Sequence, residues 1–322
     1  MEIINTLSST NNNTDPTILN QIRDIIDFVD IIPISKGYSS DLKFLLTTKS
    51  SRRYLARITL SDNISELRAR EEQYNRLKEL RQFSLLVPEP HRFRLADDGR
   101  SCLMILDYID GEDGEEALCM MSSEDQYKVG YQAGEELRKL HQYPAPFEAP
   151  SWHLMKKRKY EWYYAKYTQS PVKVTEINLD RIQKYVRAHL HLMEGIIQTF
   201  QHDDYHPANL IIHNGHLNGI IDFNRSDWGD PIHDFYKIAL FTRHVSIPFA
   251  RGQIDGYWGG SIPSDFWNRY ALYCAMSIVP DLVWSERQSR QTGSYELDRS
   301  IKRVLAMVID HDGFSRTIPG WY

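Results

Sequence analysis

The sequence has few cysteines and no long apolar segment. Its three cysteines, Cys102, Cys119 and Cys274, are widely spaced among 322 residues. A small and odd number of cysteines excludes a disulfide-stabilised scaffold and indicates a reducing compartment. No stretch approaches the ~18 apolar residues that a membrane-spanning helix needs, and the N-terminus lacks the basic and apolar regions of a signal peptide. We therefore expect a cytoplasmic protein that does not bind membranes.

A strong excess of charge is also absent. The formal net charge is −5, which argues against nucleic acid as the main partner. Hydrophobic residues make up 42% of the chain and charged residues 25%, as in ordinary globular proteins. No internal repeat and no low-complexity linker divides the sequence. The length suffices for one large domain or for two lobes with their own cores.

One short segment carries most of the chemical information. Residues 202–209 read His-Asp-Asp-Tyr-His-Pro-Ala-Asn, and Asp222 follows thirteen positions later within Ile-Asp-Phe. An Asp, an Asn five residues later and a second Asp at a strand are typical of phosphoryl-transfer sites. The pattern predicts that Asp204 orients and deprotonates an attacking hydroxyl. It also predicts that Asn209 and Asp222 bind Mg²⁺ beside the phosphates of a nucleotide.

Local sequence places the two expected metal ligands close together. An apolar run at 209–213 and a second expected strand at 216–222 flank Asn214-Gly215, a pair that favours a tight hairpin turn. Asn209 precedes this turn by five residues and Asp222 follows it by seven. In an antiparallel hairpin the two side chains therefore lie at the same end, within about two residues of each other in register.

Hydrophobic periodicity predicts a strand-rich first part and a helical second part. After a poorly ordered start at 1–15, we expect a helix from Pro16 to about Val29, strands at 31–35, 42–48, 54–58, 87–95 and 102–109, and a helix at 64–81. From Asp110 we expect helices at 122–141, 152–167 and 177–197, then mainly helix after the hairpin, with a Gly/Ser-rich loop at 252–264. The expected domains are thus a nucleotide-binding lobe at 1–109 and a catalytic, substrate-binding lobe at 110–322.

Several residues of the first part are candidates for nucleotide contacts. The turn Lys36-Gly37-Tyr38-Ser39-Ser40 could bring backbone N–H groups and the hydroxyls of Ser39 and Ser40 to phosphates, although a plain hairpin turn explains it as well. Arg57 lies on a strand where kinases carry a phosphate-binding Lys, with an exposed strand arginine as the alternative. Backbone groups near Asp107 and Ile109 could hydrogen-bond a purine. The expected helix at 64–81 offers no obvious Glu to pair with Arg57, since Gln73 occupies the middle of the helix face on which that Glu would lie.

Polar residues around the motif have simpler expected roles. We interpret His202 as a structural histidine that braces the loop, and Asp203 as a solvated side chain. Asp230 precedes a proline and is expected to cap a helix. Asp234 is expected to be a buried acceptor that ties this helix to the loop at 202–209.

Taken in order, these segments resemble the aminoglycoside phosphotransferase and choline kinase superfamily, the small-molecule relatives of protein kinases. The resemblance covers residues 30 to 322 and rests on the turn at 36–40, the Arg57 strand, Leu140-His141, the motifs at 202–209 and 221–223, and Gly-Asp-Pro-Ile-His-Asp at 229–234. The chain departs from the family at Asp203, where Gly is frequent. Phe223-Asn224 in place of Phe-Gly, with no Ala-Pro-Glu segment after it, favours a small-molecule kinase over a protein kinase.

The resemblance implies an α+β, bilobal protein-kinase-like fold, with a small β-rich N-terminal lobe, a larger α-rich C-terminal lobe and Mg²⁺ with ATP or GTP between them. It implies that Asp204 is the catalytic base, that Asn209 and Asp222 are the Mg²⁺ ligands, and that Arg57, Ser39 and Ser40 contact phosphates. It also implies transfer of the γ-phosphate to a hydroxyl of a small molecule, with an aminoglycoside-type antibiotic, and hence resistance, as the first candidate.

The acceptor depends on weaker signals. Polycationic acceptors need carboxylates, and the candidates are Asp110, Glu112, Asp113, Glu115, Glu116, Asp227 and Asp255, which are equally explained as surface acids. The aromatic helix at 152–167 could stack on a sugar or surround a choline-like cation, or belong to the core. The C-terminal Trp321-Tyr322 could bring its carboxylate to the acceptor.

The sequence pattern is also compatible with other functions. The acceptor could be a macrolide sugar, choline, a hydroxylated amino acid or another metabolite. A non-catalytic, nucleotide-binding kinase-like module would also fit much of the pattern. A metal-dependent phosphohydrolase could use the cluster formed by His202, Asp203, Asp204, His206, His233 and Asp234.

Overall fold

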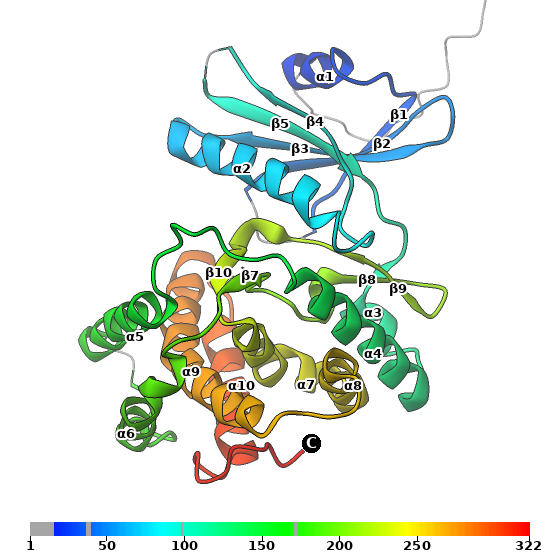
Figure 1. Ribbon diagram of the computed structural model, residues 1–322. Helices are drawn as coiled ribbons and strands as arrows, with labels where there is room; N and C mark the ends of the chain where they lie inside the picture. Colours follow the sequence, from blue (N-terminus) through cyan, green and yellow to red (C-terminus); the bar gives the residue numbers. More distant parts are fainter. Residues whose placement is uncertain (1–15, 37–39, 98, 171–172) are drawn as a thin grey trace, which may run out of the picture. The chain divides into compact units, whose positions relative to one another are not determined.

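The computed structural model describes residues 16–36, 40–97, 99–170 and 173–322 (Figure 1). The chain forms two compact units. The first unit contains Met1–Lys78 and Pro88–Tyr108, and the second contains Glu79–Val87 and Ile109–Tyr322.

The first unit is built on a five-stranded antiparallel sheet in the order β1-β2-β3-β5-β4. Its elements are α1 (Pro16–Arg23), β1 (Asp30–Pro33), β2 (Leu42–Thr47), β3 (Arg53–Leu60), α2 (Ile64–Leu80), β4 (Pro90–Leu95) and β5 (Ser101–Asp107). The five predicted strands and the helix at 64–81 are confirmed. The predicted extension of α1 to Val29 is wrong, because the Val29 N–H donates instead to the Thr47 carbonyl, 2.8 Å away, and the chain joins the sheet.

The core of the first unit follows the period-two alternation of its strands. Its fully or almost fully buried side chains are Ile22, Phe44, Leu46, Ala56, Ile58, Leu103 and Ile105. Alternate positions of β2, β3 and β5 therefore face the same apolar layer, and burial of each large side chain stabilises the fold by about 2 kcal/mol. Arg57 lies between two of these core positions, so its side chain is on the opposite face of the sheet.

The second unit is mainly helical and contains two small sheets (Figure 1). Its helices are α3 (Gly114–Leu118), α4 (Ser123–Leu140), α5 (Trp152–Gln169), α6 (Leu179–His189), α7 (Arg243–Val245), α8 (Ile247–Trp258), α9 (Ser264–Thr292) and α10 (Glu296–Asp310). Its strands are β6 (Glu112–Asp113), β7 (Thr199–Gln201), β8 (Leu210–His213), β9 (His216–Ile220) and β10 (Asp227–Gly229). The first unit's sheet and these helices confirm the predicted α+β class.

The predicted loop at 252–264 is wrong over its first half, which is part of α8. Glycines cause the difference, because they serve here for close packing of α4 on α8 and not for turns. A Cβ on Gly252 or Gly256 would collide with the carbonyl oxygens of Tyr127 and Tyr131 on α4. On the other side, Gly130 and Gly134 of α4 approach the backbone of α8 in the same way.

The helix predicted at 177–197 is also shorter than expected. It ends at His189, followed by a 3₁₀ turn at Leu190–Met193. Gly195 then has φ +68°, and the chain leaves for β7, where the Phe200 N–H donates to the Tyr143 carbonyl at 2.9 Å. Sheet pairing that is distant in sequence therefore overrides helix propensity in this segment.

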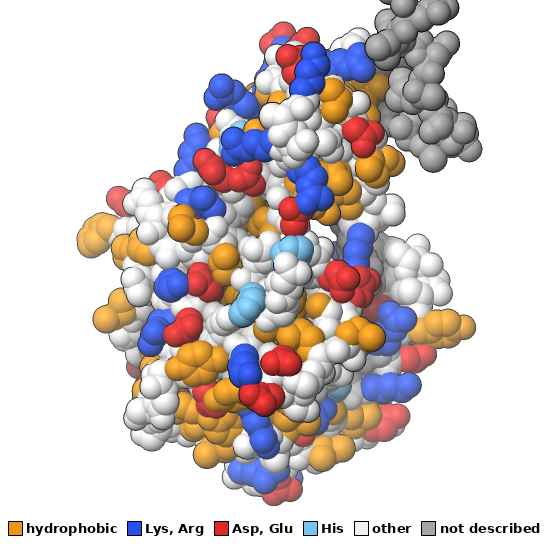
Figure 2. Space-filling model, turned by 90° about the vertical axis from the view of Figure 1, so that its right-hand side faces the viewer, with side chains coloured by type: hydrophobic (Ala, Val, Ile, Leu, Met, Phe, Trp, Pro, Cys, Tyr) orange, Lys and Arg blue, Asp and Glu red, His pale blue; other side chains and the backbone are white. Residues whose placement is uncertain are grey.

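Among the described residues, no helix is long and apolar enough to cross a membrane. The face drawn in Figure 2 carries lysines and arginines interspersed with acidic side chains, without a large patch of one sign. This mixture agrees with the small net charge of the sequence.

Candidate active site

The hairpin of β8 and β9 brings Asn209 next to Asp222. Asn214 and Gly215 have φ values of 50° and 76°, as a type I′ turn requires. A bulge at Asn218 shifts the register, so that Leu210 is opposite Ile220 and the Ile221 N–H donates to the Asn209 carbonyl at 2.9 Å. Ile221 is thus opposite Asn209 and directly precedes Asp222. The bulge reduces the register offset between Asn209 and Asp222 from the expected two residues to one.

The side chains of Asn209 and Asp222 offer oxygen atoms suited to a hard cation. Asn209 donates from Nδ2 to the Asp204 carbonyl at 2.9 Å, which leaves its Oδ1 available. Asp222 has φ +63° and an exposed carboxylate, and no described residue hydrogen-bonds to that carboxylate. Carboxylate and amide oxygens are the ligands that Mg²⁺ prefers, so this donor set fits the predicted metal.

Asp204 is surrounded by basic side chains. Its Oδ1 accepts a hydrogen bond from Lys237 Nζ at 2.7 Å and lies 3.5 Å from His206 Nε2. Its Oδ2 is 3.9 Å from Arg225 Nε. Burial alone would raise the pKa of Asp204, but Lys237, His206 and Arg225 outweigh burial and hold that pKa well below its usual range. Asp204 is therefore a carboxylate with one oxygen firmly bound and the other more open.

His202 braces the loop, as the sequence predicts. It is fully buried; its Nε2 hydrogen-bonds the Ile221 carbonyl at 3.0 Å, and its Nδ1 accepts the Asp204 N–H at 3.3 Å. Burial lowers the pKa of His202, so the ring is neutral. The imidazole thereby connects the loop that carries Asp204 to the strand that leads to Asp222.

The predicted roles of Asp234 and Asp230 are confirmed. The buried Asp234 carboxylate accepts the N–H groups of His202 and Asp203 at 2.8 and 2.7 Å and His141 Nε2 at 3.0 Å. Asp230 accepts the Ile232 N–H at 2.9 Å as a helix cap. Arg269 and Tyr273 also bind Asp230, at 3.0 and 2.7 Å. Both carboxylates thus hold the backbone in place from within the core.

The expectation that Asp203 is solvated is wrong. Only 18% of its side chain is exposed, and its Oδ1 lies 3.3 Å from His233 Nδ1. Lys156 of α5 hydrogen-bonds the other ring nitrogen of His233. Burial raises the pKa of Asp203, against the opposing effect of Lys237 and Lys156. Asp203 also has φ +57°, a left-handed conformation that favours Gly and tolerates Asp.

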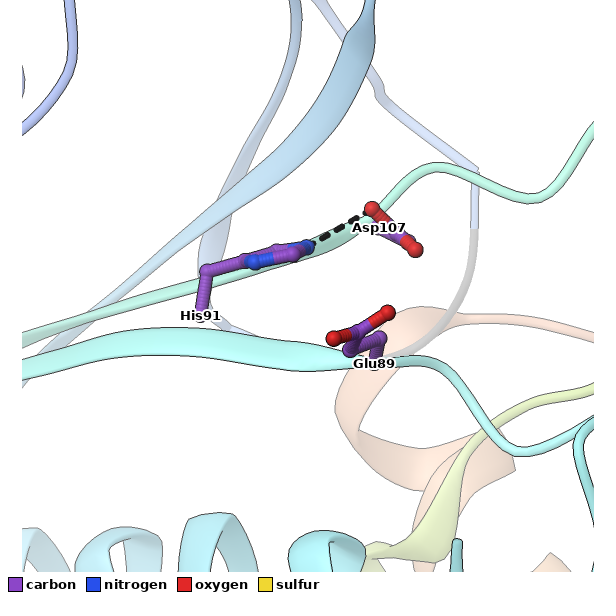
Figure 3. A group of neighbouring side chains, drawn as sticks. All are labelled: Glu89, His91 and Asp107. Atoms are coloured by element: carbon purple, nitrogen blue, oxygen red, sulfur yellow. Dashed lines mark hydrogen bonds and ion pairs between the residues drawn. The ribbon is translucent and has the colours of Figure 1, made fainter.

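The cluster required by a phosphohydrolase does not assemble. Among the described residues, one group of three or more His, Cys, Asp or Glu side chains brings its donor atoms together, namely Glu89, His91 and Asp107 of the first unit (Figure 3). There His91 Nε2 bonds Asp107 Oδ1 at 2.7 Å, and Arg52 approaches the same oxygen at 3.4 Å. Because a guanidinium already pairs with Asp107, we do not assign a metal to this group.

Arg57 is part of a buried ion-pair network in the first unit. Its Nε donates to Asp41 Oδ2 at 2.5 Å, while Thr59 and Arg70 approach Oδ1 at 2.9 and 3.5 Å. The carboxylate partner thus precedes β2 and does not come from α2, which instead contributes a second arginine. Burial tends to raise the pKa of Asp41, but Arg57 and Arg70 reverse this and lower it. Sequence spacing gave no signal for this pairing.

The other predicted nucleotide contacts are Ser39, Ser40, Asp107 and Ile109. Ser39 lies outside the described residues, and Ser40 is exposed. The N–H of Asp107 donates to the Glu89 carbonyl at 2.9 Å, so this donor is not free for a purine. Ile109, in the second unit, packs so closely on β9 that a Cβ on Gly219 would touch its side chain.

Several residues considered for the acceptor have structural roles in the second unit. Asp113 caps α3 by accepting the Glu115 N–H at 3.0 Å. Asp255 accepts the hydroxyls of Tyr127 and Tyr322 at 2.9 and 2.5 Å. In α5, Trp152, Tyr160 and Tyr167 are buried whereas Trp162 is 54% exposed. At the C-terminus the Trp321 carbonyl accepts from Arg251 at 2.9 Å.

Sequence reasoning did not identify Lys237, Lys156 or Arg225. All three lie outside the motif at 202–209: Lys237 and Arg225 approach Asp204, whereas Lys156 binds His233 beside Asp203. Lysine and arginine are common on surfaces, so their presence in the sequence carries no signal of burial.

The model of the phosphotransferase enzyme family, APH, matches residues 30–271. No curated protein matches the sequence. Three similar solved structures are the streptomycin–ATP ternary complex of APH(2")-IIa, the AMP-PNP–hygromycin B complex of a thermostable APH(4)-Ia mutant, and the GDP and kanamycin complex of APH(2")-IIia.

These likenesses extend over whole chains at low identity. The first structure has a TM-score of 0.63 at 17% identity and covers 89% of this chain and 95% of its own. The second structure has a TM-score of 0.67 at 14% identity and covers 91% of this chain and 98% of its own. The third has a TM-score of 0.66 at 14% identity and covers 90% of this chain and 97% of its own. They show a shared kinase-like fold. The family model also matches most of the length of this chain, which therefore belongs to the phosphotransferase enzyme family.

Proposed function

We propose that this protein transfers the γ-phosphoryl group of ATP or GTP to a hydroxyl of a small molecule. The observation that carries the proposal is the hairpin geometry, which places Asn209 beside Asp222 and holds Asn209 on the backbone of Asp204. Kinase-type catalysis is mostly positioning and charge neutralisation. A chain that fixes these three side chains relative to one another has the parts that this reaction needs.

In this mechanism the open Oδ2 of Asp204 accepts the hydrogen bond of the acceptor hydroxyl and turns its oxygen toward the γ-phosphorus. The acceptor O–P bond forms, the bond between the γ-phosphorus and the bridging oxygen breaks, and the proton passes to Asp204. Nucleoside diphosphate leaves. Asn209 and Asp222 would hold Mg²⁺, which neutralises charge on the phosphates when bound. Ser39, Ser40, Arg57, Asp107 and Ile109 are proposed nucleotide contacts; because the Asp107 N–H is bound to the Glu89 carbonyl, Asp107 would contact a purine through an acceptor group. The corresponding proposed lobes are 1–109 and 110–322.

An aminoglycoside-type antibiotic is the first acceptor to test, because structures of similar proteins contain streptomycin, gentamicin, kanamycin and hygromycin B. On this proposal the enzyme acts in the cytoplasm and its expression raises resistance. A macrolide sugar, choline or a hydroxylated amino acid is the alternative acceptor. A nucleotide-binding module without catalysis would bind ATP and transfer nothing.

The test is a coupled nucleoside-diphosphate release assay with MgATP and MgGTP against a panel of these acceptors. The wild type is compared with Asp204→Asn and with Asp180→Asn, a matched change at an exposed acid of α6. We expect turnover with one acceptor class, lost at least about 1,000-fold in Asp204→Asn and retained in Asp180→Asn. Equal turnover by Asp204→Asn and wild type contradicts the mechanism. Nucleotide binding with no turnover across the panel favours the binding module.

A further inference from the structure

Lys237 is a buried lysine that contacts the proposed catalytic carboxylate. It is 4% exposed, and its Nζ donates to Asp204 Oδ1 at 2.7 Å. Burying an ammonium is costly unless a carboxylate compensates it. Lysine carries its charge on a flexible stem and lacks the rigid planar donor group of arginine. The position of Nζ therefore depends on the residues that pack around the side chain.

The backbone around Lys237 is unusual and holds it in place. Lys237 directly precedes a π-helix at Ile238–Thr242, a rare conformation that occurs frequently at functional sites. The ammonium lies over the rings of Tyr236 and Phe241, 5.0 and 5.2 Å from their centroids. Phe241 also stacks on His206, with centroids 4.7 Å apart. One short segment therefore contacts the loop twice, at Asp204 through Lys237 and at His206 through Phe241.

The two oxygens of Asp204 are thereby made unequal. Oδ1 is bound by Lys237 and has His206 as a further neighbour. Oδ2 has Arg225 at 3.9 Å, beyond hydrogen-bond distance, and that arginine is half exposed. A carboxylate held by one oxygen keeps the other in a fixed direction, which is what orientation of a nucleophile requires.

We propose that Lys237 is a positioning residue for phosphoryl transfer: it binds Oδ1 of Asp204 so that Oδ2 is presented to the acceptor hydroxyl. This inference rests on the proposed function and adds to it a residue outside the motif at 202–209. Lys237 acts through Asp204 and not by binding the nucleotide. Its loss therefore reduces kcat and leaves the KM for nucleotide nearly unchanged.

The test uses hydrolysis of MgATP and MgGTP by the full-length protein, with water as the acceptor, because this reaction needs no identified small molecule. The variants are Lys237→Met, Lys237→Arg, Asp204→Asn and the double variant Asp204→Asn/Lys237→Met. Lys128→Met is the matched control, since Lys128 is exposed and pairs with Glu124 and Asp125 at the surface of α4.

We expect kcat to fall about 30-fold in Lys237→Met with less than about a twofold change in the KM for nucleotide, and to recover in part in Lys237→Arg. In the Asp204→Asn background, Lys237→Met should change the residual kcat less than about twofold, since both changes remove the same effect. Lys128→Met should match the wild type. A merely structural role would lower the fraction of active protein and would not depend on Asp204.

Each failure has a distinct signature. Wild-type activity in Asp204→Asn, or no turnover of water or any panel acceptor by the wild type, overturns the proposed function and this inference with it. If Asp204→Asn loses kcat but Lys237→Met keeps the kcat of the wild type, only the proposed role of Lys237 is overturned. The same holds if Lys237→Met lowers kcat by an equal factor in the wild type and in Asp204→Asn. If Lys237→Met does not fold, Lys237→Arg is compared with the wild type and the double variant with Asp204→Asn, because the double variant buries no unpaired carboxylate and should fold. A wild-type kcat in Lys237→Arg is then compatible with the role of Lys237, whereas a double variant more than about twofold slower than Asp204→Asn overturns that role.

Discussion

His202 Nε2 lies 3.0 Å from the backbone carbonyl oxygen of Ile221, the residue that precedes Asp222. The Asp204 N–H donates to the opposite ring nitrogen at 3.3 Å, which places the proton of the neutral imidazole on Nε2. A single buried ring therefore sets the distance between the loop with the proposed base and the strand end with a proposed metal ligand.

Replacement of His202 by Ala should impair both stability and catalysis. It removes the donor to the Ile221 carbonyl and the acceptor for the Asp204 N–H, and a buried backbone group left unpaired costs about 2 kcal/mol. With two such groups, we expect the free energy of unfolding to fall by about 2–4 kcal/mol in urea titrations and kcat to fall about tenfold or more. His213→Ala, at an exposed position of β8, is the control. A stable variant with unchanged kcat would show that the ring does not position the site.

Removal of the divalent cation or of its proposed ligand should stop transfer. Asp222 has an exposed carboxylate at the end of the hairpin, and Asp222→Asn removes a formal charge that Mg²⁺ binding uses. We expect EDTA to abolish turnover and the Mg²⁺ concentration for half-maximal rate to rise at least about tenfold in Asp222→Asn. The measurement is a Mg²⁺ titration of initial rates, with Asp180→Asn as control. Full activity in EDTA would exclude this metal site.

The stability of the first unit should depend on pH through Asp41. Its carboxylate is fully buried and bound by Arg57 and Arg70, and its pKa is lowered in the folded state. The stabilisation is thus fully present above the unfolded-state pKa of about 3.9 and is lost as pH falls through the lower folded value. We expect the urea midpoint of the wild type to fall steeply below about pH 4.

The comparison for this pH dependence is Asp41→Asn. At neutral pH it should be less stable than the wild type by about 3 kcal/mol, because two buried arginines lose their partner. Its midpoint should change less between pH 5 and pH 2 than that of the wild type. Parallel pH profiles for the two proteins would mean that Asp41 does not cause the acid sensitivity.

Substitution of Gly256 by Ala should separate α4 from α8. The new Cβ would collide with the Tyr131 carbonyl, and an overpacked site loses about 1–3 kcal/mol or more because rigid backbone must move. Gly293→Ala is the control, since it has φ +67° and open space around it, so that only backbone strain of about 1 kcal/mol applies. Thermal unfolding should show a larger loss for Gly256→Ala. An equal loss would mean that α4 and α8 adjust freely.

The local parts of the site were predictable from the sequence. Asn214-Gly215 imposes a tight turn, and fixed spacing around that turn brings Asn209 and Asp222 to one end. The capping role of Asp230 followed from the proline after it. Such features depend on residues a few positions apart, whose geometry the backbone itself restricts.

Only the tertiary structure decided the surroundings of the site. Lys237 lies 33 residues from Asp204 in sequence, and Arg57 is paired with Asp41 by strand register. Gly252 and Gly256 lie in a segment with the composition of a loop, yet this segment is part of α8. Their small size is needed because the backbone of α4 packs directly against them. Burial and charge pairing depend on contacts between distant segments. The sequence by itself therefore determined the hairpin and the motif at 202–209, and the fold decided which cations and which backbone support them.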